Sequence, residues 1–150
     1  MRFISERARW RALVLAAALF GGTVLVTTSA GAAVDDSFAA LTTDECGVAN
    51  FIDYGPGAPG GGDNDDYVVI HDYCADGHGV QVYLEMDDNG YWYSQYNGNG
   101  RAGAPVVWDP FLYGNVKPKQ KVKMEVCLVD GINDLTPLRC GYASHRSADG

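Results

Sequence analysis

Apolar and polar residues alternate with a period of two along much of the chain beyond residue 45. The two longest alternating stretches are 80–86 and 121–128. Side chains of a strand point to its two faces in turn, so this period indicates strands that are buried on one face. Shorter apolar or aromatic runs predict further strands at 48–52, 67–73, 91–96, 106–108 and 138–143. We therefore expect an all-β fold of about six or seven strands, a small antiparallel β-sandwich or open barrel.

The first 32 residues differ from the rest and are typical of a secretory signal peptide. Four arginines and one glutamate lie within residues 2–11, an uncharged apolar run covers 12–26, and small residues at 30 and 32 precede a cleavage point. The alternative is an uncleaved membrane anchor, but the apolar run is shorter than the roughly 20 residues that span a bilayer. We expect a signal-peptide helix over 1–32, a secreted, extracellular protein and no membrane association after cleavage. The mature chain is then divided into a flexible arm (33–45), a disulfide-stapled β domain (46–143) and a flexible tail (144–150).

All four cysteines lie in the exported part of the chain. An even number of cysteines in a small secreted domain indicates disulfides, and the sequence allows three pairings. We predict Cys46 with Cys74 and Cys127 with Cys140, because each pair brackets a short segment whose ends can lie on adjacent strands. Each bridge contributes about 3 kcal/mol in the chain-entropy model.

Two patterns resemble metal sites without completing one. His71, Cys74 and His78 have the spacing H-x2-C-x3-H, but a cysteine in a disulfide cannot bind zinc and a fourth ligand is missing. The run at 63–66 resembles the beginning of a calcium loop, but Tyr67 stands where that loop needs its third oxygen ligand. We interpret the run as a solvated acidic turn, and we expect no metal and no other cofactor.

Charge and motif content narrow the function. Cleavage after residue 32 removes four arginines and one glutamate, which takes the formal charge from −8 to −11. Such an acidic domain is a poor partner for nucleic acid or anionic lipid. The chain has no Gly-x-Ser-x-Gly elbow, no His-Glu-x-x-His motif and, once the disulfides form, no free cysteine beside a histidine. We expect a non-catalytic protein, with a small secreted enzyme as an alternative.

Tyr83, Trp92 and Tyr96 are the candidate binding residues, on two strands that we expect to form a hairpin. If the turn between these strands has an even number of loop residues, Leu84 shares the core face with Tyr93 and the three candidate rings lie on the opposite face. Exposed aromatic rings can stack on sugar rings or anchor a protein partner. The alternative is that a second sheet or the loop at 108–113 covers them.

Four lysines form a stripe of one parity, at 117, 119, 121 and 123. Lysines on an exposed edge strand resist edge-to-edge aggregation, and we assign them this role. A docking patch for an acidic partner is the alternative.

The C-terminal third resembles small secreted actinomycete proteins of unknown function. The resemblance is carried by Val126-Cys127-Leu128-Val129-Asp130-Gly131, Leu138-Arg139-Cys140-Gly141 and Ser147-Ala148-Asp149-Gly150. It implies an extracellular location and a disulfide hairpin, and it transfers no catalytic residue. In size and cysteine count the chain is also similar to secreted enzyme inhibitors and to antibiotic-carrier β-sandwiches. We expect a monomer that binds a protein or a carbohydrate outside the cell; the alternative is an inhibitor of an extracellular hydrolase, with a rigid loop at 97–105 or 132–137.

Overall fold

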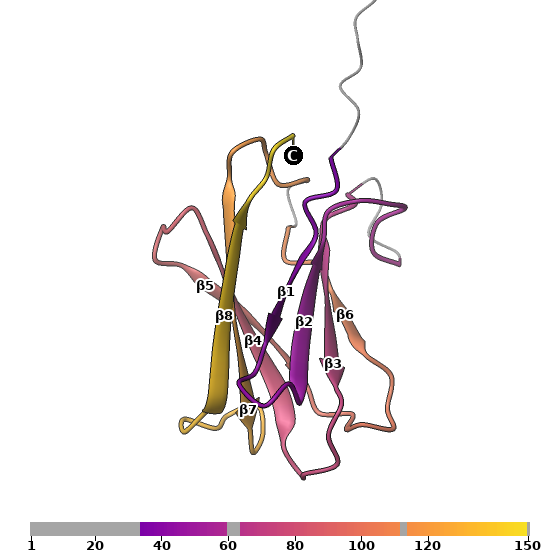
Figure 1. Cartoon of the computed structure of the whole chain (residues 1–150), viewed down its shortest axis with the longest axis vertical. Helices are drawn as coiled ribbons and strands as arrows, with labels where there is room; N and C mark the ends of the chain where they lie inside the picture. Colours follow the sequence, from indigo (N-terminus) through magenta and orange to yellow (C-terminus); the bar gives the residue numbers. More distant parts are fainter. Residues whose placement is uncertain (1–33, 60–63, 112–113, 150) are drawn as a thin grey trace, which may run out of the picture. The chain divides into compact units, whose positions relative to one another are not determined.

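The structure is a computed structural model, which describes residues 34–59, 64–111 and 114–149. The expected signal-peptide helix lies outside these residues. The strands are β1 (Phe38–Leu41), β2 (Gly47–Ile52), β3 (Tyr67–Asp72), β4 (Gly79–Met86), β5 (Trp92–Asn97), β6 (Val106–Trp108), β7 (Lys121–Val129) and β8 (Leu138–Arg146). They form two antiparallel sheets with the orders β1-β2-β3-β6 and β5-β4-β7-β8, packed as a sandwich (Figure 1). The expected all-β antiparallel fold is confirmed.

The period-two pattern builds the core between the two sheets. The inward side chains of β4 up to Leu84 and those of β7 are at most 1% exposed and meet residues of the opposite sheet. The principal core residues are Val80, Val82, Leu84, Val122, Met124, Val126, Phe51, Val68 and Ile70. Full burial of one such side chain stabilises a fold by about 1.5–3 kcal/mol, so this interface is the main source of stability.

The two sheets extend beyond the domain limits that the sequence suggested. β1 lies within the expected arm at 33–45, pairs with β2 along its whole length and places Ala40 in the core. β8 continues to Arg146, into the expected tail at 144–150. The limits are corrected accordingly. The four residues of β1, two of them alanine, show too little alternation to be recognised as a strand. The last three residues of β8 are polar because they are all exposed to solvent.

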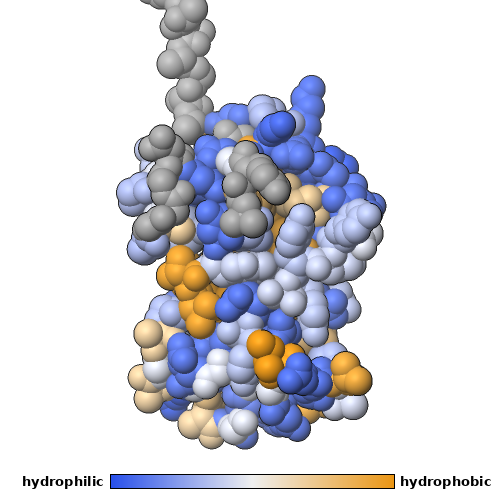
Figure 2. All heavy atoms as spheres, turned by 180° about the vertical axis from the view of Figure 1, so that it is seen from behind, coloured by the Kyte–Doolittle hydropathy of each residue, from blue (hydrophilic) through white to orange (hydrophobic). Residues whose placement is uncertain are grey.

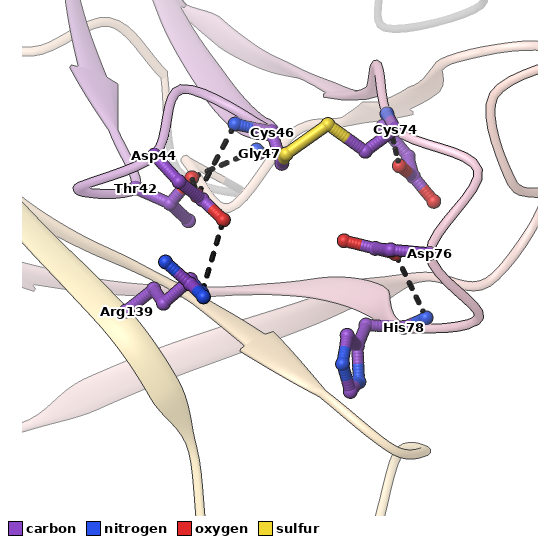
Figure 3. Close-up of a disulfide and its surroundings, with 9 residues drawn as sticks. Thr42, Asp44, Cys46, Gly47, Cys74, Asp76, His78 and Arg139 are labelled. Carbon is purple, nitrogen blue, oxygen red and sulfur yellow. Dashed lines mark hydrogen bonds and ion pairs between the residues drawn. A yellow bond between two sulfur atoms is a disulfide. The ribbon is translucent and has the colours of Figure 1, made fainter.

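Contact between β1 and β8 closes one side of the sandwich. A Cβ atom at Gly141 would lie 3.0 Å from the carbonyl carbon of Leu41 and closer still to its oxygen. Only glycine therefore allows these two backbones to approach so closely. The N–H of Thr43 donates to the carbonyl of Arg139 at 2.9 Å, and the Arg139 guanidinium pairs with Asp44 at 3.2 Å (Figure 3).

The opposite side, between β5 and β6, is less well covered. Leu84 pairs with Tyr93, as an even turn predicts, but Tyr93 is 49% exposed. The expectation that its whole face is core is therefore corrected: β5 lies at the edge of its sheet, and β6, at the edge of the other sheet, has only three residues. A cavity of about 230 Å³ lies beside Tyr93 and is also lined by Met86 and Phe111.

Both disulfides lie at the end of the sandwich away from the C-terminus (Figure 1), and both predicted pairings are confirmed. Cys46–Cys74 joins the β1–β2 turn to the β3–β4 loop (Figure 3), and Cys127–Cys140 joins β7 to β8. Between Val126 and Leu128 the register shifts, because two residues of β8 stand opposite Cys127. This β-bulge changes which residues of β8 face outward.

In residues 34–59, 64–111 and 114–149, no helix is both long and apolar enough to cross a membrane.

Candidate functional site

The outward side chains of the sheet β5-β4-β7-β8 form three rows across the strands. From the β4–β5 turn toward the disulfides, the rows are Trp92–Glu85–Lys123, Ser94–Tyr83–Glu125–Tyr142 and Tyr96–Gln81–Cys127. The three predicted aromatic residues therefore lie on one face, as a four-residue turn at 87–90 requires. We call Tyr83, Trp92, Tyr96 and Tyr142 the aromatic face.

Solvent reaches the rings of the aromatic face to different extents. Trp92 is 42% exposed and Tyr142 66% exposed, whereas Tyr83 and Tyr96 are half-buried. The other sheet packs on the opposite side of these strands, so the alternative in which it covers the rings does not hold. Sequence reasoning missed Tyr142, since its direction follows from the bulge in β8 and the alternation of residues alone does not reveal it.

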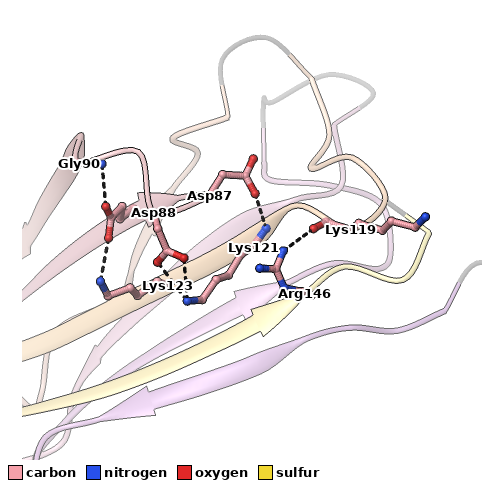
Figure 4. Close-up of polar contacts among 8 residues, drawn as sticks. Asp87, Asp88, Gly90, Lys119, Lys121, Lys123 and Arg146 are labelled. Carbon is pink, nitrogen blue, oxygen red and sulfur yellow. Dashed lines mark hydrogen bonds and ion pairs between the residues drawn. The ribbon is translucent and has the colours of Figure 1, made fainter.

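A charged pair holds Trp92 in place. The Lys123 ammonium lies 4.8 Å from the centre of the indole ring and 2.8 Å from Oε2 of Glu85. The other carboxylate oxygen of Glu85 accepts the N–H of Gly90 at 2.8 Å (Figure 4). The hydrogen bond from Lys123 holds the pKa of Glu85 below its usual range, and Glu85 in turn raises the pKa of Lys123. Both groups are therefore charged at neutral pH, and the cation contacts the ring as in a cation–π pair.

The lysine stripe does not protect a sheet edge. Lys121 and Lys123 point outward from β7, which lies between β4 and β8, so the edge-strand interpretation is corrected. Lys121 instead pairs with Asp88 of the β4–β5 turn at 3.0 Å (Figure 4). Lys119 lies before β7, where its carbonyl accepts a hydrogen bond from Arg146 at 3.0 Å. The sequence correctly placed Lys121 and Lys123 on the same face of their strand, but whether β7 is a central or an edge strand depends on which strands pair with it.

Hydrogen-bonding groups lie between the rings of the aromatic face. The Tyr142 hydroxyl donates to Oε1 of Glu125 at 2.6 Å, and this bond raises the pKa of Tyr142. Gln81, beside Tyr96, is only 5% exposed, and its Oε1 has no hydrogen-bond partner among the described residues. The face thus combines apolar rings with carboxylate, amide and hydroxyl groups.

The ring of Tyr96 packs closely against the backbone of two glycines, Gly79 and Gly98. A Cβ atom at Gly79 would lie 2.5 Å from Cε2 of Tyr96, and one at Gly98 would lie 2.5 Å from Cε1. The ring therefore occupies the space that side chains at 79 and 98 would fill. The Tyr96 ring can lie against the sheet because residues 79 and 98 have no side chains.

A cleft of about 600 Å³ adjoins Tyr96 at the disulfide end of the sandwich. Its walls are the glycine-rich loops before β4 and after β5, and His78, Asn99 and Arg101 contribute polar groups. Ligand sites are commonly concave. Tyr96 belongs both to the aromatic face and to the wall of this cleft, so the two form one continuous surface.

The histidine and cysteine pattern does not form a metal site. Cys74 is in a disulfide, and His71 stacks on Tyr73 with ring centres 5.2 Å apart. His78 pairs with Asp130 at 2.7 Å. Among the described residues these three do not form a group of metal ligands.

Four aspartates meet at the other end of the sandwich. Asp36 precedes β1, Asp53 follows β2, Asp66 precedes β3 and Asp149 follows β8. Carboxylate oxygens of Asp36, Asp53 and Asp149 lie within 4.8 Å of one another. Burial raises the pKa of Asp66 to about 7, with the neighbouring Asp53 adding to the effect, and burial also raises the pKa of Asp53. We call these residues the four-aspartate cluster. Sequence reasoning noticed only Asp66, as part of an acidic turn, because the other three are far from it along the chain.

Comparisons with protein-family models, with curated proteins and with solved structures find no match to this chain. The resemblance to actinomycete proteins stays a prediction, and the surfaces described above are what supports a functional proposal.

Proposed function

We propose that this protein is secreted and that its mature domain binds a neutral carbohydrate chain through the aromatic face. The observation that carries the proposal is a set of four outward rings on one sheet, with Trp92 exposed and held by Lys123 and Glu85. Sugars present apolar C–H faces that stack on aromatic rings, and hydroxyl groups that need hydrogen-bond partners. Glu125 and the hydroxyl of Tyr142 supply such partners beside the rings.

The charges on this face favour a neutral ligand. Glu85 and Asp88 are already paired with Lys123 and Lys121, so few uncompensated charges remain to attract a charged partner. The domain is acidic throughout, with a formal charge of −11 after cleavage at residue 32, and it repels anionic glycans at long range.

The dimensions favour a chain of several sugars. Trp92 and Tyr96 are four residues apart on β5, which corresponds to about 13 Å at the rise of an antiparallel strand. The side of the molecule in Figure 2 shows only small, separate hydrophobic patches in a largely hydrophilic surface.

Secretion is supported by two independent features. The N-terminal pattern is that of a signal peptide. The described domain contains two disulfides and no free cysteine, which is typical of proteins that fold in an oxidising compartment.

The test is a glycan array probed with the mature domain. The neutral oligosaccharide that binds best is then titrated by calorimetry into the wild type and two variants, Trp92→Ala and Tyr73→Ala. We expect Trp92→Ala to weaken binding by about 10- to 100-fold, as loss of an aromatic anchor does. Tyr73→Ala is the control, since Tyr73 is 52% exposed but lies beyond β3 in the other sheet. Equal affinities of the two variants, or no binding on the array, would refute the proposal.

Inhibition of an extracellular hydrolase is the second candidate function, because one loop has the required form. Cys127–Cys140 closes the loop between β7 and β8, in which Leu135 is 92% exposed. Asp134 accepts hydrogen bonds from the N–H groups of Asp130 and Thr136 and so holds the loop in shape. An assay against secreted hydrolases distinguishes the candidates: an inhibitor loses potency in Leu135→Ala and keeps it in Trp92→Ala.

A further inference from the structure

The four-aspartate cluster contains buried carboxylate oxygens that receive no hydrogen bond from the described residues while the carboxyl groups are ionised. Asp53 is 6% exposed and Asp66 1% exposed, and Oδ1 of each is buried without a hydrogen-bond donor. The two side chains lie within hydrogen-bonding reach of each other, so either a shared proton or a cation must offset their repulsion. Asp66 is not one of the three aspartates whose oxygens lie within 4.8 Å of one another, so its unsatisfied oxygen is a separate observation. A buried carboxylate oxygen without a donor or a cation is costly.

The donors around the cluster do not balance its charge. Asp36 accepts from His145 Nε2 at 3.1 Å and from the N–H of Ala148. The other oxygens of Asp53 and Asp66 accept backbone N–H groups, from Asp36 at 3.2 Å and from Val116. In the part of the chain that the structure describes, no lysine or arginine pairs with these four carboxylates.

We propose that the four-aspartate cluster binds a calcium ion. The ligands are carboxylate oxygens only, which suits a hard cation, whereas zinc prefers nitrogen and sulfur. Calcium takes six to eight oxygens in a flexible geometry, and water completes such a shell. Magnesium demands a nearly ideal octahedron, which side chains from four separate segments do not readily provide.

The site joins parts of the chain that lie far apart. Asp36, Asp53 and Asp66 flank strands of one sheet, and Asp149 follows the last strand of the other. A bound ion therefore connects the two sheets and fastens both ends of the described domain. This consequence is independent of carbohydrate binding.

The first experiment uses the mature domain and the metal alone. Calorimetry with CaCl2 should give a dissociation constant of about 0.1–1 mM, the range of extracellular calcium modules. Thermal unfolding in 10 mM CaCl2 should occur about 5–10 °C higher than in EDTA, because the ion binds only the folded state. MgCl2 at the same concentration should give a clearly smaller shift. An unchanged melting temperature and no binding heat would overturn the proposal.

Variants then locate the ion. In EDTA, Asp66→Asn should be at least as stable as the wild type, since its amide can donate to the unsatisfied oxygen of Asp53. In calcium it should lose most of the rise in melting temperature. Asp76→Asn is the matched control, because it removes one exposed charge at the opposite end and should keep the full rise. A full rise in Asp66→Asn would place the ion elsewhere and overturn the assignment.

Asp149→Asn gives a second measurement that does not touch the core. Asp149 is only half-buried and follows β8, so its substitution should not prevent folding. We expect its calcium affinity to be about tenfold lower than that of the wild type, and an unchanged affinity contradicts its role as a ligand.

Discussion

The close packing of the Tyr96 ring on Gly79 allows a test of the candidate site that needs no ligand. A Cβ atom at residue 79 would lie 2.5–2.7 Å from ring carbons of Tyr96, whereas carbon atoms in contact are about 3.5–4.0 Å apart. In Gly79→Ala the ring must therefore move by about 1 Å or more. Because the ring is the end of a rotatable side chain, we expect it to swing away while the strands stay paired.

The size of the effect follows from two opposing terms. Overpacking against Tyr96 costs about 1–3 kcal/mol. Replacing glycine by alanine inside a strand stabilises by about 0.5–1 kcal/mol. Gly79→Ala should thus destabilise the wild type by up to about 2 kcal/mol, whereas in a Tyr96→Ala background the same change should stabilise the protein.

The assay is urea denaturation of the wild type, both single variants and the double variant. The resulting coupling energy should be about 1–3 kcal/mol, well above the 0.3–0.5 kcal/mol expected for independent sites. Equal effects of Gly79→Ala in the two backgrounds would show that Tyr96 does not rest on residue 79. Once a glycan is identified, Gly79→Ala should weaken its binding as Tyr96→Ala does, while Tyr73→Ala, exposed beyond β3 in the other sheet, should not.

Three further predictions concern the rest of the molecule. Gly141→Ala should destabilise the domain by about 2–3 kcal/mol in urea denaturation, because its Cβ would meet the backbone of Leu41; a change below about 0.5 kcal/mol would contradict the close contact of β1 and β8. Burial raises the pKa of Asp72 above its ordinary value of 3.8, so stability is greatest while this group is protonated and falls as the pH rises through the raised pKa. Asp72→Asn should therefore gain stability over the wild type as the pH rises above about 4, as measured by denaturation at several pH values, and a constant difference would refute this. Mass spectrometry of the culture medium should find a chain that begins at Ala33, or within a residue or two of it, whereas a full-length chain in the membrane fraction would contradict export.

Local patterns in the sequence were sufficient for most of the fold. Seven of the eight strands could be located because alternation and β-branched residues act within a few positions of the chain. Both disulfide pairings could be predicted, since each joins segments that are close in sequence. The direction of Tyr83, Trp92 and Tyr96 also followed from the sequence, because the parity of one short turn decides it.

The remaining features depend on contacts between distant parts of the chain. β1 forms a strand because β2 and the core accept Ala40, although its own pattern is weak. Lys121 and Lys123 lie on a central strand because β8 pairs with β7. The β8 bulge, which turns Tyr142 outward, exists only in that pairing.

The two proposed sites show the same division. The shared face of Tyr83, Trp92 and Tyr96 could be recognised from the local sequence. The position of the Tyr96 ring, however, depends on Gly79, which only the pairing of β4 with β5 brings beside it. The four-aspartate cluster has no local signature at all. Its members come from four strand ends between residues 36 and 149, and antiparallel packing places those ends together. Strand formation is decided by neighbours in sequence, whereas a site at the end of a sandwich is decided by which strands pair and in what register.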